Sequence, residues 1–222
     1  MATPNTTTLA TLATALVLTV AGCHTPAGNA TTPTAPSTGG PDIGAARAAL
    51  AGLTVAPEDT GAHYKREDWL PRWATVRGAC DTRETALQQQ GKDVRTDGRC
   101  KAISGTWVSP YDPPNQATIT KAASTDLDHL VPLAEAARSG TRGWSKTQRE
   151  AFANDLTQLV VVSAKSNRSK GDQDPARWLP TAGYRCTYAA RYVLTKAKYR
   201  LAVDKAEHDV LAGLLSKCAP AR

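Results

Sequence analysis

The fold of this 222-residue chain is constrained most by four cysteines, at Cys80, Cys100, Cys186 and Cys218. They follow an uncharged run of small and aliphatic residues, LATLATALVLTV at 9–20. Such a run is too short to cross a bilayer and is typical of the apolar core of a signal peptide. An even number of cysteines behind an export signal predicts disulfides, which persist in oxidising compartments. Because none of the four forms a CxxC pair, a zinc site is the weaker interpretation.

The apolar run leads into VAGC, with small residues before Cys23. This pattern resembles the lipobox of bacterial lipoproteins, in which the cysteine becomes the lipidated first residue. We therefore expect residues 1–22 to be a signal peptide of the lipoprotein type and Cys23 to be the only membrane anchor. Since no Lys or Arg precedes Cys23, an ordinary secretory signal and an uncleaved anchor are the alternatives. The sequence predicts an exported protein, either extracellular or held at the cell membrane by lipid.

The chain divides by composition. Residues 23–62 are mostly Thr, Pro, Ala, Gly and Ser, with hardly any large apolar side chain before Ile43. Such a segment buries too little surface to offset the entropy of ordering, so we expect a disordered tether. Residues 63–222 then form one domain, which we expect to be a monomer. The net charge of +7 favours a polyanionic partner, such as nucleic acid or an anionic envelope polymer.

The C-terminal segment has the periodicity of two helices. Apolar residues recur at helical spacing over 184–203 and again over 210–215. Between these runs, Asp204 with Glu207 three residues later resembles a capping box. The pattern predicts a tight helical hairpin.

This hairpin also suggests how the cysteines pair. Its open end would bring Cys186, at the start of the first helix, next to Cys218, at the end of the second. Cys80 is then left to pair with Cys100.

Before the hairpin, the sequence predicts helices and strands in alternation. Short helical pieces are expected over about 65–90, and two β-prone stretches at 105–109 and 116–120 flank a turn rich in Pro and Asp. A capped helix is expected from 145, and a continuous apolar run at 156–162 predicts a buried strand. A further helix should begin at Ser163 and end near Gly171.

The stretch STDLDHLVPLAEA, at 124–136, carries the clearest chemical signal. Asp128 and His129 end a short extended segment that Pro132 stops. In an extended segment Asp126 and Asp128 share one face, and His129 lies on the other.

Within 126–180, the segments DLDHLVPL and FANDLTQLVVVSAKSNRSKGDQDPARWLP resemble HNH endonucleases of the ββα-metal (His-Me finger) fold. They are most similar to exported proteins related to the C-terminal domain of GmrSD restriction enzymes. The resemblance extends from Tyr64, through CDTRE, to Cys218. It implies an α+β domain with a ββα-metal centre, flanking helices and the C-terminal hairpin. It also implies a metal-dependent endonuclease that hydrolyses phosphodiester bonds of nucleic acid, with DNA as the expected substrate.

The resemblance assigns roles to four residues. Asp128 binds the metal, His129 is the general base, Asn154 steadies the loop that carries the histidine, and Asn167 is the second metal ligand. Phosphodiester cleavage needs such a base and a cation to neutralise charge. Two oxygen ligands with room for waters favour one Mg²⁺ ion, or Mn²⁺ in its place, over a closed structural zinc site. The alternatives are a turn residue at Asn154 and a helix-surface residue at Asn167.

Other residues are candidates for supporting roles. Asp126 and Glu135 lie close enough in sequence to hold a ligand, although a salt bridge to an arginine is the alternative. Arg168 and Lys170 flank Asn167 and are candidate phosphate contacts, the alternative being a solvated helix end. Arg83, in CDTRE, matches the family motif and joins the phosphate candidates.

Two rival functions are open at this point. One is a catalytically inactive HNH-like lipoprotein that holds nucleic acid at the cell surface, and the other is a lipoprotein that binds anionic envelope polymers. Neither explains why an Asp-His pair coincides with the two asparagines.

Overall fold

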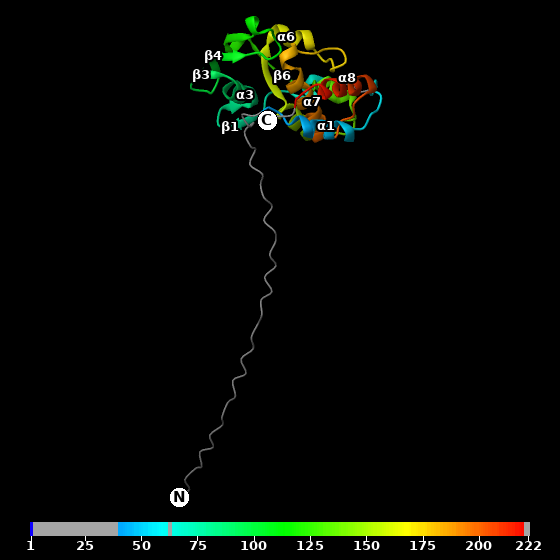
Figure 1. The fold of residues 1–222 in the computed structure, drawn as a ribbon. Coiled ribbons are helices and arrows are strands. Elements are labelled where there is room, and N and C mark those ends of the chain that lie inside the picture. The colour runs from blue at the N-terminus through cyan, green and yellow to red at the C-terminus, as the bar shows by residue number, and fades with distance from the viewer. Residues whose placement is uncertain (2–39, 62–63, 220–222) are drawn as a thin grey trace. The chain divides into compact units, whose positions relative to one another are not determined.

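The structure is a computed structural model that describes residues 40–61 and 64–219, together with Met1. Its longer elements are, in chain order, α1 (Ile43–Gly52), α2 (Arg66–Trp69), β1 (Thr75–Arg77), β2 (Cys80–Asp81), α3 (Thr82–Gln90), β3 (Lys92–Thr96), β4 (Ala102–Val108), β5 (Thr118–Lys121), β6 (Thr125–His129), α4 (Leu133–Arg138), α5 (Lys146–Ala153), β7 (Leu159–Ser163), α6 (Ala164–Lys170), α7 (Arg185–Tyr199) and α8 (Lys205–Ser216). The strands form three antiparallel sheets, ordered β1-β2, β3-β4-β5 and β6-β7. The predicted α+β class is thus confirmed (Figure 1). No helix within these described ranges is long and apolar enough to span a membrane.

The pair β6-β7 lies between two hydrophobic clusters. Val160 and Val162 belong to the cluster that also holds α1, α7 and α8, whereas Leu159 and Val161 belong to the cluster under α3 and β4. Successive strand residues point to opposite faces, so a strand covered on both faces needs apolar residues at every position. This explains the continuous apolar run that predicted the strand.

Helix α6 follows β7 directly and contacts both β6 and β7. The side chain of Ser163 accepts a hydrogen bond from the Ser166 backbone N–H, so it caps the helix start. Gly171 ends the helix at a φ of 56°, where a residue with a Cβ would be strained. The predicted bounds of this helix are confirmed.

The helical hairpin and both disulfides are also as predicted. α7 and α8 pack together beside α1 (Figure 1). Cys186 is joined to Cys218 at a Cα–Cα distance of 5.6 Å. Cys80 is joined to Cys100, which connects β2 to the loop before β4. Both bonds agree with an exported protein.

The hairpin predicted around the Pro- and Asp-rich turn is present as β4 and β5, which pair antiparallel. A third strand, β3, joins this sheet; its sequence KDVRT does not predict a strand because it has one apolar residue.

The predicted tether was wrong for its last part. Residues 43–52 form α1, whose Ile43, Ala46 and Leu50 are buried in the core. Arg47 donates hydrogen bonds to the carbonyl oxygens of Leu215, at 2.7 Å, and Cys218, at 2.8 Å, at the end of α8. The helix therefore belongs to the folded domain. The signal peptide, Cys23 and the rest of the tether lie outside the described residues.

Candidate active site

Asp128 is almost fully buried in β6 and is held by donors from two other segments. Lys170 Nζ donates to Asp128 Oδ1 at 3.0 Å and Oδ2 at 2.9 Å, and Tyr111 Oη donates to Oδ2 at 2.6 Å. Burial raises the pKa of Asp128 above its ordinary value, while Lys170 and Tyr111 oppose that shift. The carboxylate is thus fixed in direction by α6 and by the loop after β4.

His129, the last residue of β6, has one ring nitrogen tied to the backbone. Its Nε2 lies 2.8 Å from the carbonyl oxygen of Ala153. A carbonyl oxygen can only accept, so Nε2 carries the hydrogen. Burial lowers the pKa of His129 to about 3, although the bond to Ala153 opposes the shift. The ring is therefore neutral, with a free electron pair on Nδ1.

Asn154 ends α5 and connects three segments. Its Oδ1 accepts hydrogen bonds from the Ala74 backbone N–H and from Thr82 Oγ1, both at 2.8 Å, and its Nδ2 donates to the Glu150 carbonyl at 2.9 Å. The residue before Asn154 supplies the carbonyl that binds His129. In this position Asn154 could steady His129 through the Ala153 carbonyl.

A cavity of about 230 Å³ lies beside these residues. It is bordered by Asp128, His129 and Asn167, and on other sides by Tyr64, Arg66 and Asp172. The structure therefore brings three of the four sequence-predicted residues to one cavity.

Asn167 is oriented by Asp126. Its Nδ2 donates to Asp126 Oδ2 at 3.0 Å. This bond fixes the orientation of the amide and leaves Oδ1 as the atom that could bind an ion. No residue within 40–61 or 64–219 donates to that oxygen. Asp126 contacts Asn167 and Asp128 contacts Lys170, both in α6. The two aspartates therefore share one face of β6, as predicted.

The donor set fits Mg²⁺ or Mn²⁺. The Asp128 carboxylate and the Asn167 amide oxygen are the hard oxygen ligands that these ions prefer, and both residues border the cavity. Asp128 Oδ2 already accepts hydrogen bonds from both Lys170 and Tyr111, whereas Oδ1 accepts only from Lys170, so Oδ1 keeps one lone pair with which it could bind an ion. Asp126 would not bind the ion itself; it would hold the ligand Asn167 in place through their hydrogen bond.

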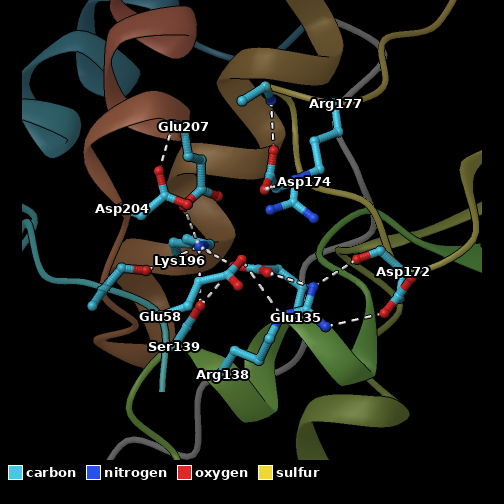
Figure 2. Close-up of polar contacts among 12 residues, drawn as sticks. Glu58, Glu135, Arg138, Ser139, Asp172, Asp174, Arg177, Lys196, Asp204 and Glu207 are labelled. Atoms are coloured by element: carbon cyan, nitrogen blue, oxygen red, sulfur yellow. Dashed lines mark hydrogen bonds and ion pairs between the residues drawn. The ribbon is translucent and has the colours of Figure 1, made fainter. Parts of the chain in front are cut away.

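Glu135 lies in a separate charged cluster, drawn in Figure 2. Carboxylate oxygens of Glu58, Glu135 and Asp174 lie within 4.8 Å of one another. Arg138 contacts Glu135 at 3.0 Å and Glu58 at 3.4 Å, and Lys196 contacts Glu135 at 2.9 Å. These cations supply the counter-charge that a metal would otherwise provide. The salt bridge that the sequence left open as the alternative for Glu135 is therefore present.

Two of the side chains predicted to contact phosphate, Lys170 and Arg83, bind other protein groups instead. Lys170 has no exposed surface, and its ammonium contacts Asp128 and the His129 carbonyl, so a phosphate cannot reach it. Arg83 pairs with Glu84 at 2.7 Å and donates to the Ala122 carbonyl, an arrangement that connects α3 to the segment before β6. Arg168 is exposed on α6, next to Asn167.

Three further residues at the site, Arg66, Trp73 and Tyr111, are not predicted by the sequence. Arg66 borders the cavity, and the rings of Trp73 and His129 stack with centroids 5.7 Å apart. Tyr111 binds Asp128. All three are distant in sequence from 126–180, and only tertiary structure brings them there.

Comparison with known proteins identifies the family of this chain. Residues 81–214 match the family described as the C-terminal domain of GmrSD restriction endonucleases. The chain belongs to this family. The GmrSD C-terminal match includes β6, β7 and α6 and all four residues to which the sequence assigned roles.

A curated relative of this GmrSD-type domain is an uncharacterized secreted protein of Arthroderma benhamiae, 44% identical over 181 residues. The alignment covers 80% of this chain and 87% of that protein. No solved structure matches the chain. Together with the disulfides, the secreted relative supports export.

Proposed function

We propose that the protein is a metal-dependent HNH endonuclease that hydrolyses phosphodiester bonds of nucleic acid, with DNA as its substrate, outside the cytoplasmic membrane. The observation that carries this proposal is the placement of His129. Its Nε2 hydrogen is given to the Ala153 carbonyl, which leaves Nδ1 as the acceptor, and the residue borders the cavity shared by Asp128 and Asn167.

In the proposed reaction, His129 Nδ1 takes the proton of the attacking water. The ring becomes cationic as it does so, and the Ala153 carbonyl stabilises the charge through the Nε2 hydrogen. Since the ring is already neutral, no prior loss of a proton is needed.

Asp128 and Asn167 would hold the divalent ion through their oxygens. A bound Mg²⁺ supplies positive charge that stabilises the phosphate and the leaving oxygen. Lys170 and Tyr111 keep Asp128 in place from behind, and Asp126 keeps Asn167 in place.

Arg66 is the cation best placed to bind the substrate phosphate. It is exposed and borders the cavity, and no carboxylate among the described residues forms an ion pair with it. A guanidinium binds phosphate with paired hydrogen bonds. Arg168 would contact a flanking phosphate on the α6 side.

The test is cleavage of supercoiled plasmid by the purified mature protein, with Mg²⁺ or with a chelator. We expect nicked or linear DNA with Mg²⁺ and intact plasmid with chelator, and less cleavage of RNA of equal length. Binding of plasmid without cleavage in either Mg²⁺ or Mn²⁺ would contradict the proposal and favour the inactive scaffold. Equal cleavage with chelator would contradict the role of the metal.

We also propose lipidation at Cys23, which rests on the VAGC pattern alone. Cys23→Ala should then move the protein from the membrane fraction to the medium. Retention of the variant in the membrane would contradict this.

A further inference from the structure

Trp73 covers one face of the His129 ring. The two rings are nearly parallel, with an interplanar angle of 16° and centroids 5.7 Å apart. The Ala153 carbonyl contacts the edge of the same imidazole at Nε2. A contact on the face restricts tilting and a contact on the edge restricts rotation, so the pair together determine where Nδ1 points.

Both contacts are anchored by the same side chain. Asn154 Oδ1 accepts from the backbone N–H of Ala74, the residue after Trp73, at 2.8 Å. Asn154 itself follows Ala153 at the end of α5. The segment carrying the indole and the segment carrying the carbonyl are thus joined at one point.

We propose that Trp73 is a positioning residue for His129, which holds the imidazole in the orientation needed for proton transfer. This inference rests on the proposed function. Proton transfer requires the base within hydrogen-bond reach of the water, and a small misplacement of a reacting group lowers the rate strongly. The indole also packs against both hydrophobic clusters, so the alternative role is packing alone.

Three substitutions separate positioning from packing. Trp73→Ala should lower kcat by about 10- to 100-fold while leaving KM within about two-fold, because the ring is misplaced but the substrate contacts remain. Trp73→Phe keeps a flat ring and should retain most of kcat. Trp73→Leu fills much of the same space without a flat face and should be as slow as Trp73→Ala.

Trp144→Ala is the matched control. Trp144 is also a half-buried indole, but it packs on Trp69, Phe152 and Tyr199. Its removal should lower the unfolding temperature without lowering kcat at a temperature where all variants are folded. Equal rates for Trp73→Phe and Trp73→Leu, or a wild-type rate for Trp73→Ala, would overturn the proposal.

A second readout does not need activity. In ¹⁵N-labelled protein, with the His129 signals assigned by loss in His129→Ala, wild type should show one tautomer with the hydrogen on Nε2. Trp73→Ala should show averaging between tautomers, whereas Trp144→Ala should not. If wild type cleaves nothing, the proposed function fails, and unchanged ring signals in Trp73→Ala would independently overturn the positioning role.

Discussion

Lys170 is fully buried, and its ammonium donates hydrogen bonds to Asp128 and His129. Its ammonium lies 2.9 and 3.0 Å from the two Asp128 oxygens and 2.7 Å from the His129 carbonyl. Two charges buried this deeply are costly unless each satisfies the other. The sequence predicted a phosphate contact because a lysine near a helix end is usually solvated, and it carries no sign that this end of α6 is covered.

Lys170→Met should therefore lower the free energy of unfolding by about 3–5 kcal/mol, since it leaves the Asp128 charge buried without its partner. Urea denaturation measures this. Arg168→Met, an exposed cation of the same helix, is the control and should change stability by less than about 0.5 kcal/mol. Adding Asp128→Asn to Lys170→Met should recover part of the loss. Equal stability of the two single variants would contradict the buried pair.

At the scale of elements, α1 shows where composition misleads. The segment IGAARAALAG is rich in Ala and Gly and follows a long Thr- and Pro-rich stretch, a composition that predicts a tether. Alanine has the highest helix propensity, and the spacing of Ile43, Ala46 and Leu50 places one side chain per turn on a single face. That spacing was the sequence signal for a packed helix. Only the fold shows that this face packs on α7 and α8.

Leu50→Ala tests whether α1 belongs to the domain. Because Leu50 is buried, the substitution should lower the free energy of unfolding by about 2–5 kcal/mol. Ala48→Ser, on the exposed side of the same helix, should have little effect. If residues 43–52 were part of a tether, the two variants would be equally stable.

At the scale of the whole molecule, the sequence predicted most of what is local. The capping box at Ser145 and the β7 run rest on short-range patterns, and the Cys186–Cys218 disulfide rests on pairing within one hairpin. The Cys80–Cys100 disulfide followed because these two cysteines remained, and all four features are confirmed. The sequence predicted the site residues that lie within 126–180 but not those contributed by other segments. The contacts of Trp73 and Tyr111 depend on long-range packing, which periodicity does not encode.

The charged cluster in Figure 2 makes the stability of the whole domain depend on pH. Lys196 contacts both Glu135, at 2.9 Å, and Glu207, at 2.7 Å. Burial raises the pKa of Glu207 from 4.5 to about 7, and Lys196 opposes the shift. Burial also acts to raise the pKa of Glu135, but Lys196 and Ser139 outweigh it, so that pKa lies below its ordinary value. One lysine thus neutralises one of two buried carboxylates, and the other retains a proton.

Between pH 4.5 and about 7, folded Glu207 binds a proton that the unfolded chain has released. Its contribution to stability is therefore fully present below pH 4.5 and is lost as the pH rises through about 7. Glu207→Gln cannot titrate, so its unfolding free energy should fall less than that of wild type between pH 5 and about pH 8. Asp209→Asn, an exposed change in the same helix, should follow wild type in this range. If the unfolding free energy of Glu207→Gln fell with pH as steeply as that of wild type, this carboxyl would not be the titrating group.

The most direct measurement compares plasmid cleavage by His129→Ala and His208→Ala, purified in the same way, in Mg²⁺. His208 lies on α8 and does not border the cavity, so its loss should leave the rate unchanged. If His129 is the general base, its loss should lower the cleavage rate by about 10²- to 10⁴-fold while DNA binding is retained. Cleavage by His129→Ala at the rate of His208→Ala would contradict the mechanism at its centre.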